Sequence, residues 1–199
     1  GPNTGGMGAY SPSNKVNKRL LDRIQEEIIN PTIKGIRNEK ILFNGLIFFG
    51  LMITETGPKV IEYNVRFGDP ECQTLLPLIK SDFLLLLNST VEDKLDKYKL
   101  EISKNSSVCV VLTTKGYPET YSKNLRINKL KNILDKKNIN VFHAATYKKN
   151  GDYFSNGGRV LSVVCQNKEL VYAREQAYKI IEDINWEYGF YRNDIGIDN

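Results

Sequence analysis

The residues that could do chemistry most directly lie in one short stretch, KVIEYNVRFGDPE, at residues 59–71. Its alternation of polar and apolar residues predicts a β-strand over residues 59–67, because side chains alternate between the two faces of a strand. Glu62, Asn64 and Arg66 then share one face, and the opposite face is apolar. Such a strand presents a carboxylate, an amide and a guanidinium in line, spaced about 7 Å apart.

These three groups suit a metal ion and a phosphate group. Mg²⁺ prefers hard oxygen ligands and is commonly held by one or two protein groups together with phosphate oxygens. Glu62 can supply charged oxygens, Asn64 a neutral carbonyl oxygen, and Arg66 a planar fork for a phosphoryl or carboxylate group. Phosphoryl transfer depends mainly on such positioning and charge stabilisation, so the set indicates that chemistry. A surface strand whose polar face is simply solvated fits the alternation as well.

Five further stretches have a distinctive composition. They are GPNTGGMGAYSP at 1–12, KGYPETY at 115–121, VFHAAT at 141–146, NGGRVLSVV at 156–164 and GFYRNDIG at 189–196. Together with E-x-N-x-R and the FGDPE that follows it, they resemble, in the same order, the phosphoribosylamine–glycine ligase family of the ATP-grasp superfamily. E-x-N-x-R alone occurs across ATP-grasp ligases, whereas the ordered set is specific. The resemblance covers nearly the whole chain.

The resemblance implies a carbon–nitrogen ligase of purine biosynthesis. Members of the family use ATP to phosphorylate glycine to an acyl phosphate, which the amine of 5-phosphoribosylamine attacks to give glycinamide ribonucleotide, ADP and phosphate. The implied cofactors are ATP and Mg²⁺ or Mn²⁺. Glu62 and Asn64 would be the metal ligands, and Arg66 would be the catalytic residue that stabilises the charge of the acyl phosphate. No nucleic acid or membrane is implied as a partner.

The resemblance also implies a set of substrate-binding residues, which are Asn3, Thr4, Gly5, Gly6, Met7, Gly8, Asp69 and Arg159. Glycines in the opening loop would let backbone amides approach an anion closely. Without the resemblance, that loop would be interpreted as an ordinary flexible connector.

Three residues near these motifs have competing interpretations. We interpret Asp69 and Glu71 mainly as turn and helix-cap residues, with direct ligand binding as the alternative. Our hypothesis for Arg159 is that it helps to bind the phosphate of phosphoribosylamine, and the alternative is a solvated arginine beside a Gly-Gly hairpin turn.

The elements that must position these residues predict an α+β fold. We expect the second half of an ATP-grasp domain, an antiparallel sheet with helices, over residues 1–98, followed by a small α/β C-terminal domain over residues 99–199. The periodicity predicts strands at 45–55, 59–67, 108–113, 140–148 and 159–165, and helices at 15–34, 69–79, 81–95 and 168–184. Ser13 or Asn14 is expected to cap the first helix, Asp69 the second. We expect loops at 1–14 and 149–158.

Composition narrows the class of protein. The chain has 199 residues, of which 41% are hydrophobic, enough for one sizeable core or two small ones. Its net charge of +5 comes from lysines that are spread rather than clustered, which argues against a nucleic-acid module. No apolar run approaches the ~18 residues of a membrane span. Cys72, Cys109 and Cys165 are expected to be free thiols in a reducing, cytoplasmic setting.

Two further expectations concern packing. His143 lies in an apolar stretch and is interpreted as a packed, hydrogen-bonded side chain. Many relatives carry a glycine where Ala145 stands, which weakens any claim of a site there. The aromatic residues near the C-terminal end are expected to pack in the core rather than to stack on bases. They are Trp186, Tyr188, Phe190 and Tyr191.

The opening Gly/Pro/Asn-rich loop would normally connect two elements, so we expect this chain to be part of a longer protein. The N-terminal domain and the first ATP-grasp subdomain, with the phosphate-gripping lysines and most of the adenine pocket, are not recognisable, and this chain alone is expected to be inactive. Three alternatives stay open: another ATP-grasp carboxylate–amine ligase or carboxylase, a non-enzymatic binding domain on the same scaffold, and a basic nucleic-acid module.

Overall fold

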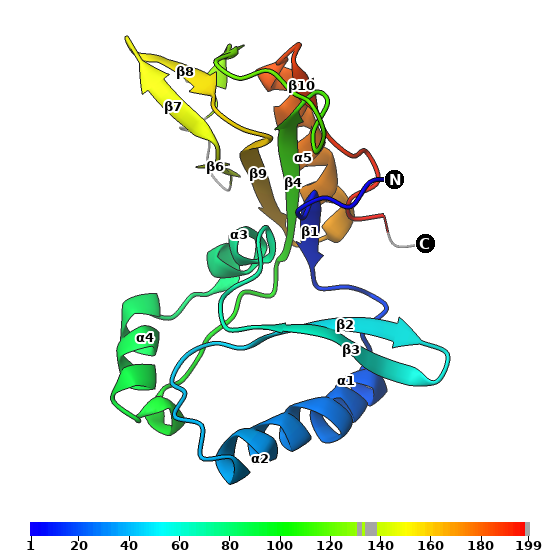
Figure 1. The fold of residues 1–199 in the computed structure, drawn as a ribbon, viewed down its shortest axis with the longest axis vertical. Coiled ribbons are helices and arrows are strands. Elements are labelled where there is room, and N and C mark those ends of the chain that lie inside the picture. Colours follow the sequence, from blue (N-terminus) through cyan, green and yellow to red (C-terminus); the bar gives the residue numbers. More distant parts are fainter. Residues whose placement is uncertain (131–132, 134–138, 198–199) are drawn as a thin grey trace.

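The computed structural model describes residues 1–130, 133 and 139–197. Its largest element is a five-stranded antiparallel sheet, which forms the upper part of Figure 1. Strands β4 (Ser106–Thr114) and β9 (Arg159–Asn167) lie in the middle of this sheet. β1 (Gly8–Ser11) flanks β4, and β6 (Ile139–His143) flanks β9. The short β10 (Gly189–Phe190) pairs with the end of β4.

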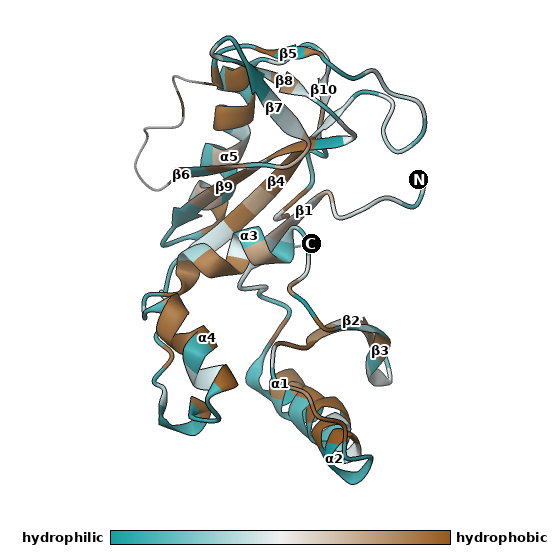
Figure 2. Cartoon of the chain, turned by 60° about the vertical axis from the view of Figure 1, so that its left-hand side comes forward, coloured by the Kyte–Doolittle hydropathy of each residue, from teal (hydrophilic) through white to brown (hydrophobic). Residues whose placement is uncertain are grey.

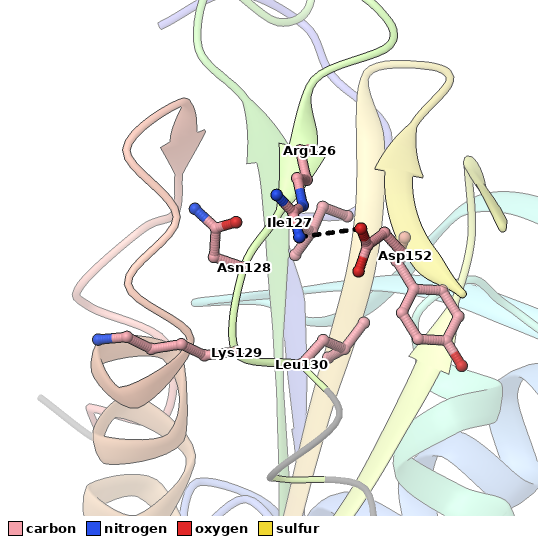
Figure 3. A pocket seen from close by; sticks show the side chains of 7 residues that line it. Arg126, Ile127, Asn128, Lys129, Leu130 and Asp152 are labelled. Atoms are coloured by element: carbon pink, nitrogen blue, oxygen red, sulfur yellow. Dashed lines mark ion pairs between the residues drawn. The ribbon is translucent and has the colours of Figure 1, made fainter. Parts of the chain in front are cut away.

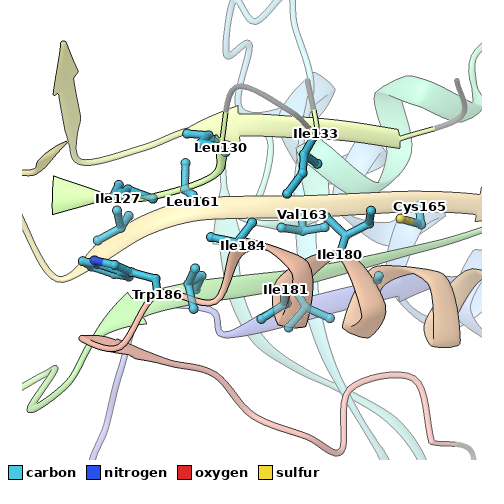
Figure 4. Close-up of a cluster of buried hydrophobic side chains, with 14 of the residues drawn as sticks. Ile127, Leu130, Ile133, Leu161, Val163, Cys165, Ile180, Ile181, Ile184 and Trp186 are labelled. Carbon is cyan, nitrogen blue, oxygen red and sulfur yellow. The ribbon is translucent and has the colours of Figure 1, made fainter. Parts of the chain in front are cut away.

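The main core lies between this sheet and helix α5 (Leu170–Ile184). The helix places apolar residues on one face at helical spacing, and these are Ala173, Ala177, Ile180, Ile181 and Ile184. They pack against Val108, Val110 and Leu112 of β4 and against Leu161 and Val163 of β9. Figure 4 shows Ile180, Ile181 and Ile184 of the helix beside Leu161 and Val163. The buried strands appear as hydrophobic bands in Figure 2. Because both faces of β4 are covered, the whole strand is buried.

The opposite face of the sheet is covered by α3 (Glu71–Leu75), which continues as a 3₁₀ turn over Leu76–Leu78. Thr74 of α3 is buried, as are Cys109 and Val111 on the facing strand. This helix directly follows the E-x-N-x-R segment, so its packing ties that segment to the sheet.

The lower part of Figure 1 contains a β-hairpin and a long helical segment. β2 (Phe48–Thr54) pairs with β3 (Gly57–Asn64) in the hairpin. The helical segment runs from α1 (Lys18–Ile24) through a π-helical turn at Gln25–Ile29 into α2 (Asn30–Asn38). A hydrogen bond from Arg23 to the Thr56 carbonyl ties α1 to the hairpin turn.

The remaining elements are small. α4 (Phe83–Val91) begins at Asp82, whose side chain accepts a hydrogen bond from the Leu85 amide, and a 3₁₀ turn follows at Leu95–Lys97. A second antiparallel sheet has the order β5 (Arg126–Ile127), β8 (Asp152–Ser155) and β7 (Thr146–Lys149). Among the described residues, no helix is long and apolar enough to cross a membrane.

The α+β expectation is confirmed, and most predicted elements are present, but several details were wrong. The expected loop at 1–14 contains β1, which pairs with a strand about one hundred residues away. The expected loop at 149–158 contains β8, and the strand expected at 140–148 is divided into β6 and β7. These errors have different causes. β1 was missed because its partner β4 is distant in the chain, whereas β7 and β8 form a local hairpin across Asn150 and Gly151, whose Asn-Gly turn signal was overlooked.

The helix starts also differ from expectation. Asn17, not Ser13 or Asn14, caps the first helix, and its side chain accepts a hydrogen bond from the Leu20 amide. The predicted cap at Asp69 was wrong as well. Pro70 occupies the cap position of α3 without a side-chain hydrogen bond. The Asp69 carboxylate instead forms an ion pair with Arg159 of β9.

The aromatic residues near the C-terminal end are only partly in the core. Trp186 is buried and Tyr191 packs against the core, as expected. Tyr188 and Phe190 are exposed, so that part of the prediction was wrong. Phe190 lies in the edge strand β10, which touches the sheet through its backbone.

Candidate functional site

The side chains singled out in the E-x-N-x-R segment line one pocket of about 570 Å³. Glu62 and Asn64 lie in β3, and Arg66 lies two residues beyond the end of that strand. The Arg66 guanidinium donates a 2.8 Å hydrogen bond to the Phe67 carbonyl and is otherwise exposed. The strand and the residues that follow it therefore bring a carboxylate, an amide and a guanidinium to one concave space.

The segment after β3 adds a second carboxylate to this pocket. Glu71, in the first turn of α3, lines the pocket together with Gly68. A Cβ atom at Gly68 would lie 2.4 Å from Glu71 Oε2, so a side chain there would displace the carboxylate. The sequence predicts a turn or helix-cap role for Glu71, and Gly68 is not among the predicted site residues. The close fit between the two residues depends on the three-dimensional turn and has no local sequence signal.

The opposite wall of the pocket comes from the opening loop and from β9. Thr4, Gly5, Gly6 and Arg159 all line it. Arg159 Nη2 lies 2.5 Å from Asp69 Oδ2, and Arg159 Nη1 donates to the Asp69 and Gly6 carbonyls at 3.1 and 3.2 Å. The pocket therefore joins the opening loop to residues that lie about 60 and about 150 positions later in the chain.

Asp69 is bound at both carboxylate oxygens. Oδ2 faces Arg159, and Oδ1 accepts a 2.9 Å hydrogen bond from Gln73 Nε2 in α3. A carboxylate held on both sides by side chains of the same protein has less capacity left for a ligand. This arrangement favours a structural role for Asp69.

Three of the predicted substrate-binding residues do not line this pocket. Asn3 and Met7 lie on either side of the lining residues, and the Met7 carbonyl accepts a hydrogen bond from the Val111 amide. Gly8 lies in β1 and faces a separate groove beside Ile195. In the other direction, Tyr117 was not selected, although its hydroxyl accepts a 3.0 Å hydrogen bond from the Gly5 amide.

The balance of charge in the pocket suits a cation accompanied by an anion. Three carboxylates, from Glu62, Asp69 and Glu71, share it with the guanidinium groups of Arg66 and Arg159. Among the described residues, no group of three or more His, Cys, Asp and Glu side chains could hold a metal ion by itself. Oxygen donors that leave coordination positions open are typical of Mg²⁺ held jointly by protein and phosphate.

Two other features lie outside this pocket. His143 Nδ1 is 2.8 Å from Thr146 Oγ1, its ring packs against Tyr153, and desolvation lowers its pKa below the usual range. The expected hydrogen-bonded, packed state is present, although the residue remains exposed. A separate pocket in Figure 3 contains the ion pair of Arg126 with Asp152, at 2.9 Å.

The fold and the pocket define the chain as part of an ATP-grasp protein, and comparisons with known proteins agree. Residues 1–72 match the ATP-grasp (A) domain of phosphoribosylglycinamide synthetase, and residues 107–198 match the C domain of the same synthetase. The chain belongs to the phosphoribosylglycinamide synthetase family.

Individual relatives support this assignment. The phosphoribosylamine–glycine ligases of Caldanaerobacter subterraneus and Rhizobium meliloti are 44% and 45% identical over 98% of this chain. The crystal structure of the Thermotoga maritima ligase aligns with a TM-score of 0.83 at 31% identity, covering 98% of this chain and 47% of that one. A biotin carboxylase domain from Hydrogenobacter thermophilus shares the fold, with a TM-score of 0.61 at 14% identity over 88% of this chain and 38% of that one.

These matches also show how much of the relatives the chain represents. It spans 46% of the length of the two bacterial ligases. It also matches 20% of a trifunctional purine biosynthetic protein of Gallus gallus, at 44% identity over 98% of this chain.

Proposed function

We propose that the protein containing this chain joins glycine to 5-phosphoribosylamine in purine biosynthesis, using ATP and forming a glycyl phosphate. The products are glycinamide ribonucleotide, ADP and phosphate. The observation that carries this proposal is the single pocket lined by Glu62, Asn64 and Arg66 in a chain of this family. The chain would supply the metal-binding half of the site.

Each residue in the pocket has a proposed part in two chemical steps. In the first step a glycine carboxylate oxygen attacks the terminal phosphorus of ATP, and ADP leaves. In the second step the amine nitrogen attacks the glycyl carbonyl carbon, and phosphate leaves. Arg66 would stabilise negative charge on the acyl phosphate in both steps, because its planar fork matches phosphoryl oxygens.

A bound Mg²⁺ or Mn²⁺ would neutralise phosphate charge during these steps. Glu62 and Asn64 are the proposed ligands, and Glu71, which lines the same pocket, is proposed to assist. The donor set of two carboxylates and one amide fits a hard cation that takes its other ligands from phosphate and water.

Substrate binding is proposed for the opposite wall. The Thr4–Gly6 backbone would approach the substrates, and Asn3, Met7 and Gly8, which flank it, stay predictions. Arginine has five N–H donors, and its bonds to Asp69 and Gly6 use three of those of Arg159. The remaining donors could reach the phosphate of phosphoribosylamine. Asp69 would act mainly through its pairing with Arg159.

The proposed partner of this chain is the rest of the same protein, including the first ATP-grasp subdomain. The apolar face of β3 and of the residue after it is open, since Ile61 and Tyr63 of the strand are exposed and Val65, just beyond its end, is 74% exposed. Contiguous apolar surface of this kind marks an interaction site. Bacterial relatives are about twice as long as this chain, so the remaining part of such a protein is the proposed cover. The division into domains 1–98 and 99–199 is also a proposal, and the separate matches of residues 1–72 and 107–198 to two domain families support it.

The assay that tests the function compares acids as substrates of the full-length protein. We expect ADP release to require both glycine and phosphoribosylamine. Release driven equally by bicarbonate or by other acids would favour another ATP-grasp ligase or carboxylase. Failure of any acid to drive release would favour a binding domain without activity. The cytoplasmic location stays a prediction, and a relative in Arabidopsis thaliana is named as chloroplastic.

A further inference from the structure

Two residues from the segment that matches the C domain hold the opening loop in place. Tyr117 Oη accepts a hydrogen bond from the Gly5 amide at 3.0 Å, and Arg159 Nη1 donates to the Gly6 carbonyl at 3.2 Å. The loop itself belongs to the segment that matches the ATP-grasp domain. Two consecutive loop residues are therefore held by side chains of the segment that matches the C domain, Gly5 through its amide N–H and Gly6 through its carbonyl oxygen.

The same arginine also holds the other side of the pocket. It bonds both the carboxylate and the carbonyl of Asp69, three residues beyond Arg66. Asp69 is held in turn by Gln73 of α3, which packs on the central sheet. One side chain thus links the opening loop to the turn that follows the E-x-N-x-R strand.

Close packing leaves this arrangement little freedom. A Cβ atom at Gly6 would lie 2.3 Å from Pro70 Cδ, and one at Gly158 would lie 2.1 Å from Tyr117 Cδ2. Contacts this short do not occur between non-bonded atoms, so a side chain at Gly6 would force the backbone to move and one at Gly158 would displace the Tyr117 ring. The loop lies directly against the turn, and Tyr117 lies directly against the backbone preceding Arg159.

We propose that Arg159 and Tyr117 are positioning residues of the ligase site, which clamp the Gly5–Gly6 loop to the Asp69 turn. The inference rests on the proposed function and deepens it. The clamp sets the distance between the loop amides and the Glu62, Asn64 and Arg66 side chains across the pocket. Small misplacements of reacting groups can cost on the order of 100-fold in rate.

The clamp contributes to kinetics more than to stability. Arg159 and Asp69 side chains are 25% and 50% exposed, and partly solvated ion pairs contribute little to folding. Loss of the clamp should therefore reduce turnover while the protein stays folded.

The test uses four variants of the full-length protein, Arg159→Gln, Arg159→Lys, Asp69→Asn and Tyr117→Phe. We expect Arg159→Gln to lower kcat about 10- to 100-fold, and Asp69→Asn to lower it less because the Arg159 bonds to the two backbone carbonyls remain, with little change in the KM for ATP. The double variant should be no worse than Arg159→Gln alone, because the Asp69 carboxylate acts through Arg159. Arg159→Lys should recover part of kcat, and Tyr117→Phe should lower kcat several-fold.

Binding of phosphate by Arg159 alone predicts a different pattern. Arg159→Gln would then raise the KM for phosphoribosylamine at unchanged kcat, and Asp69→Asn would have no such effect. That result would overturn the clamp. So would additive losses in the double variant.

Matched controls come from similar contacts away from the pocket. Arg126→Gln removes the ion pair with Asp152, and Tyr147→Phe removes the hydroxyl that donates to Asn124 at 3.2 Å. Both should leave kcat unchanged. Equal losses in these controls would assign the effects to general destabilisation and overturn the proposal.

Hydrogen exchange of the peptide containing Gly5 and Gly6 separates this inference from the proposed function. The clamp predicts faster exchange of that peptide in Tyr117→Phe and Arg159→Gln than in the wild type. If the wild type lacks glycine-dependent ADP release but exchange responds, only the proposed function fails. If the wild type is active and neither kcat nor exchange responds, only the clamp fails.

Discussion

Gly50 of β2 lies directly opposite Glu62 of β3, and the Glu62 side chain passes over the bare glycine backbone. A Cβ atom at position 50 would lie 2.9 Å from Glu62 Cγ, closer than two carbon atoms in contact normally approach. The register of the hairpin shifts immediately after this pair, between Gly50 and Leu51. Gly50 therefore leaves room for the carboxylate that we propose as a metal ligand.

Replacing Gly50 by alanine should weaken metal activation without unfolding the protein. The new methyl group would push the flexible Glu62 side chain aside, so we expect the half-saturating Mg²⁺ concentration to rise about 10-fold, as for residues that orient metal ligands. Titration of ADP release with Mg²⁺ measures this. Gly35→Ala in α2 is the control, because a Cβ atom there meets nothing within 4 Å. An unchanged Mg²⁺ dependence in Gly50→Ala would contradict the assignment of Glu62 as a metal ligand.

Replacing Arg66 by lysine should reduce turnover strongly. Lysine keeps the charge but loses the planar pair of donors, so we expect kcat to fall on the order of 100-fold. Steady-state kinetics of the full-length protein measure the loss. Arg37→Lys, at an exposed position of α2, should have no effect. If Arg66→Lys kept full activity, a bidentate contact with the acyl phosphate would be ruled out.

Replacing Ile184 by alanine should destabilise the sheet and helix α5. Ile184 is fully buried between them, and removing a buried isoleucine side chain to alanine costs about 2–5 kcal/mol. Urea denaturation measures the difference in unfolding free energy. Val171 lies on the same helix but is 53% exposed, so Val171→Ala should cost less than about 0.5 kcal/mol. Similar costs at both positions would contradict the packing described for α5.

The buried thiols should resist chemical modification, and they should make the stability of the fold depend on pH in the alkaline range. Burial raises the pKa of Cys109 from 9.0 to about 12, and that of Cys165 also to about 12. Iodoacetamide at pH 8 should therefore leave both unmodified in the folded protein and modify them after unfolding, which mass spectrometry can follow. Burial raises the pKa of Cys72 as well, yet this thiol is only half-buried and should react first.

The sign of the pH effect follows from the same shifts. The unfolded chain releases the thiol protons near pH 9, whereas the folded protein retains them until about pH 12. The contribution of these thiols to stability is therefore constant below pH 9 and is lost as pH rises from 9 to 12. Denaturation midpoints of Cys109→Ser and Cys165→Ala variants should show a weaker decline over that interval than the wild type. An identical decline would contradict the shifts.

Local sequence predicted the elements whose evidence is local. The hairpin of β2 and β3 was visible because alternation and a Gly-containing turn lie within twenty residues, and α5 was visible from the helical spacing of Ala173, Ala177 and Ile181. The pocket set of Glu62, Asn64 and Arg66 followed from alternation along a single strand. In each case the partners that define the pattern are close in the chain.

Most of the missed features depend on partners far apart in the chain, whereas β8 pairs with the neighbouring β7 across a local Asn150–Gly151 turn. β1 pairs Gly8 with Val110, and the Arg159–Asp69 pair joins residues ninety positions apart. Tyr117 was overlooked for the same reason, since nothing near KGYP indicates a contact with Gly5. The sequence predicts an apolar face for the strand but not how open that face is in this chain, where Val65, just beyond β3, is 74% exposed.

Strand β1 has a practical consequence for dividing the protein into pieces. It occupies the edge of β4 along Ser107–Val110, where unpaired backbone groups would otherwise be open to solvent. A recombinant product beginning near residue 99 would lack this cover. The backbone N–H and C=O groups along this apolar edge of β4 would then have no strand partner. Such open edges recruit other chains and promote aggregation. Expression of the C-terminal sheet in isolation should therefore retain residues 8–11, for example by fusing them ahead of residue 99 through a flexible linker.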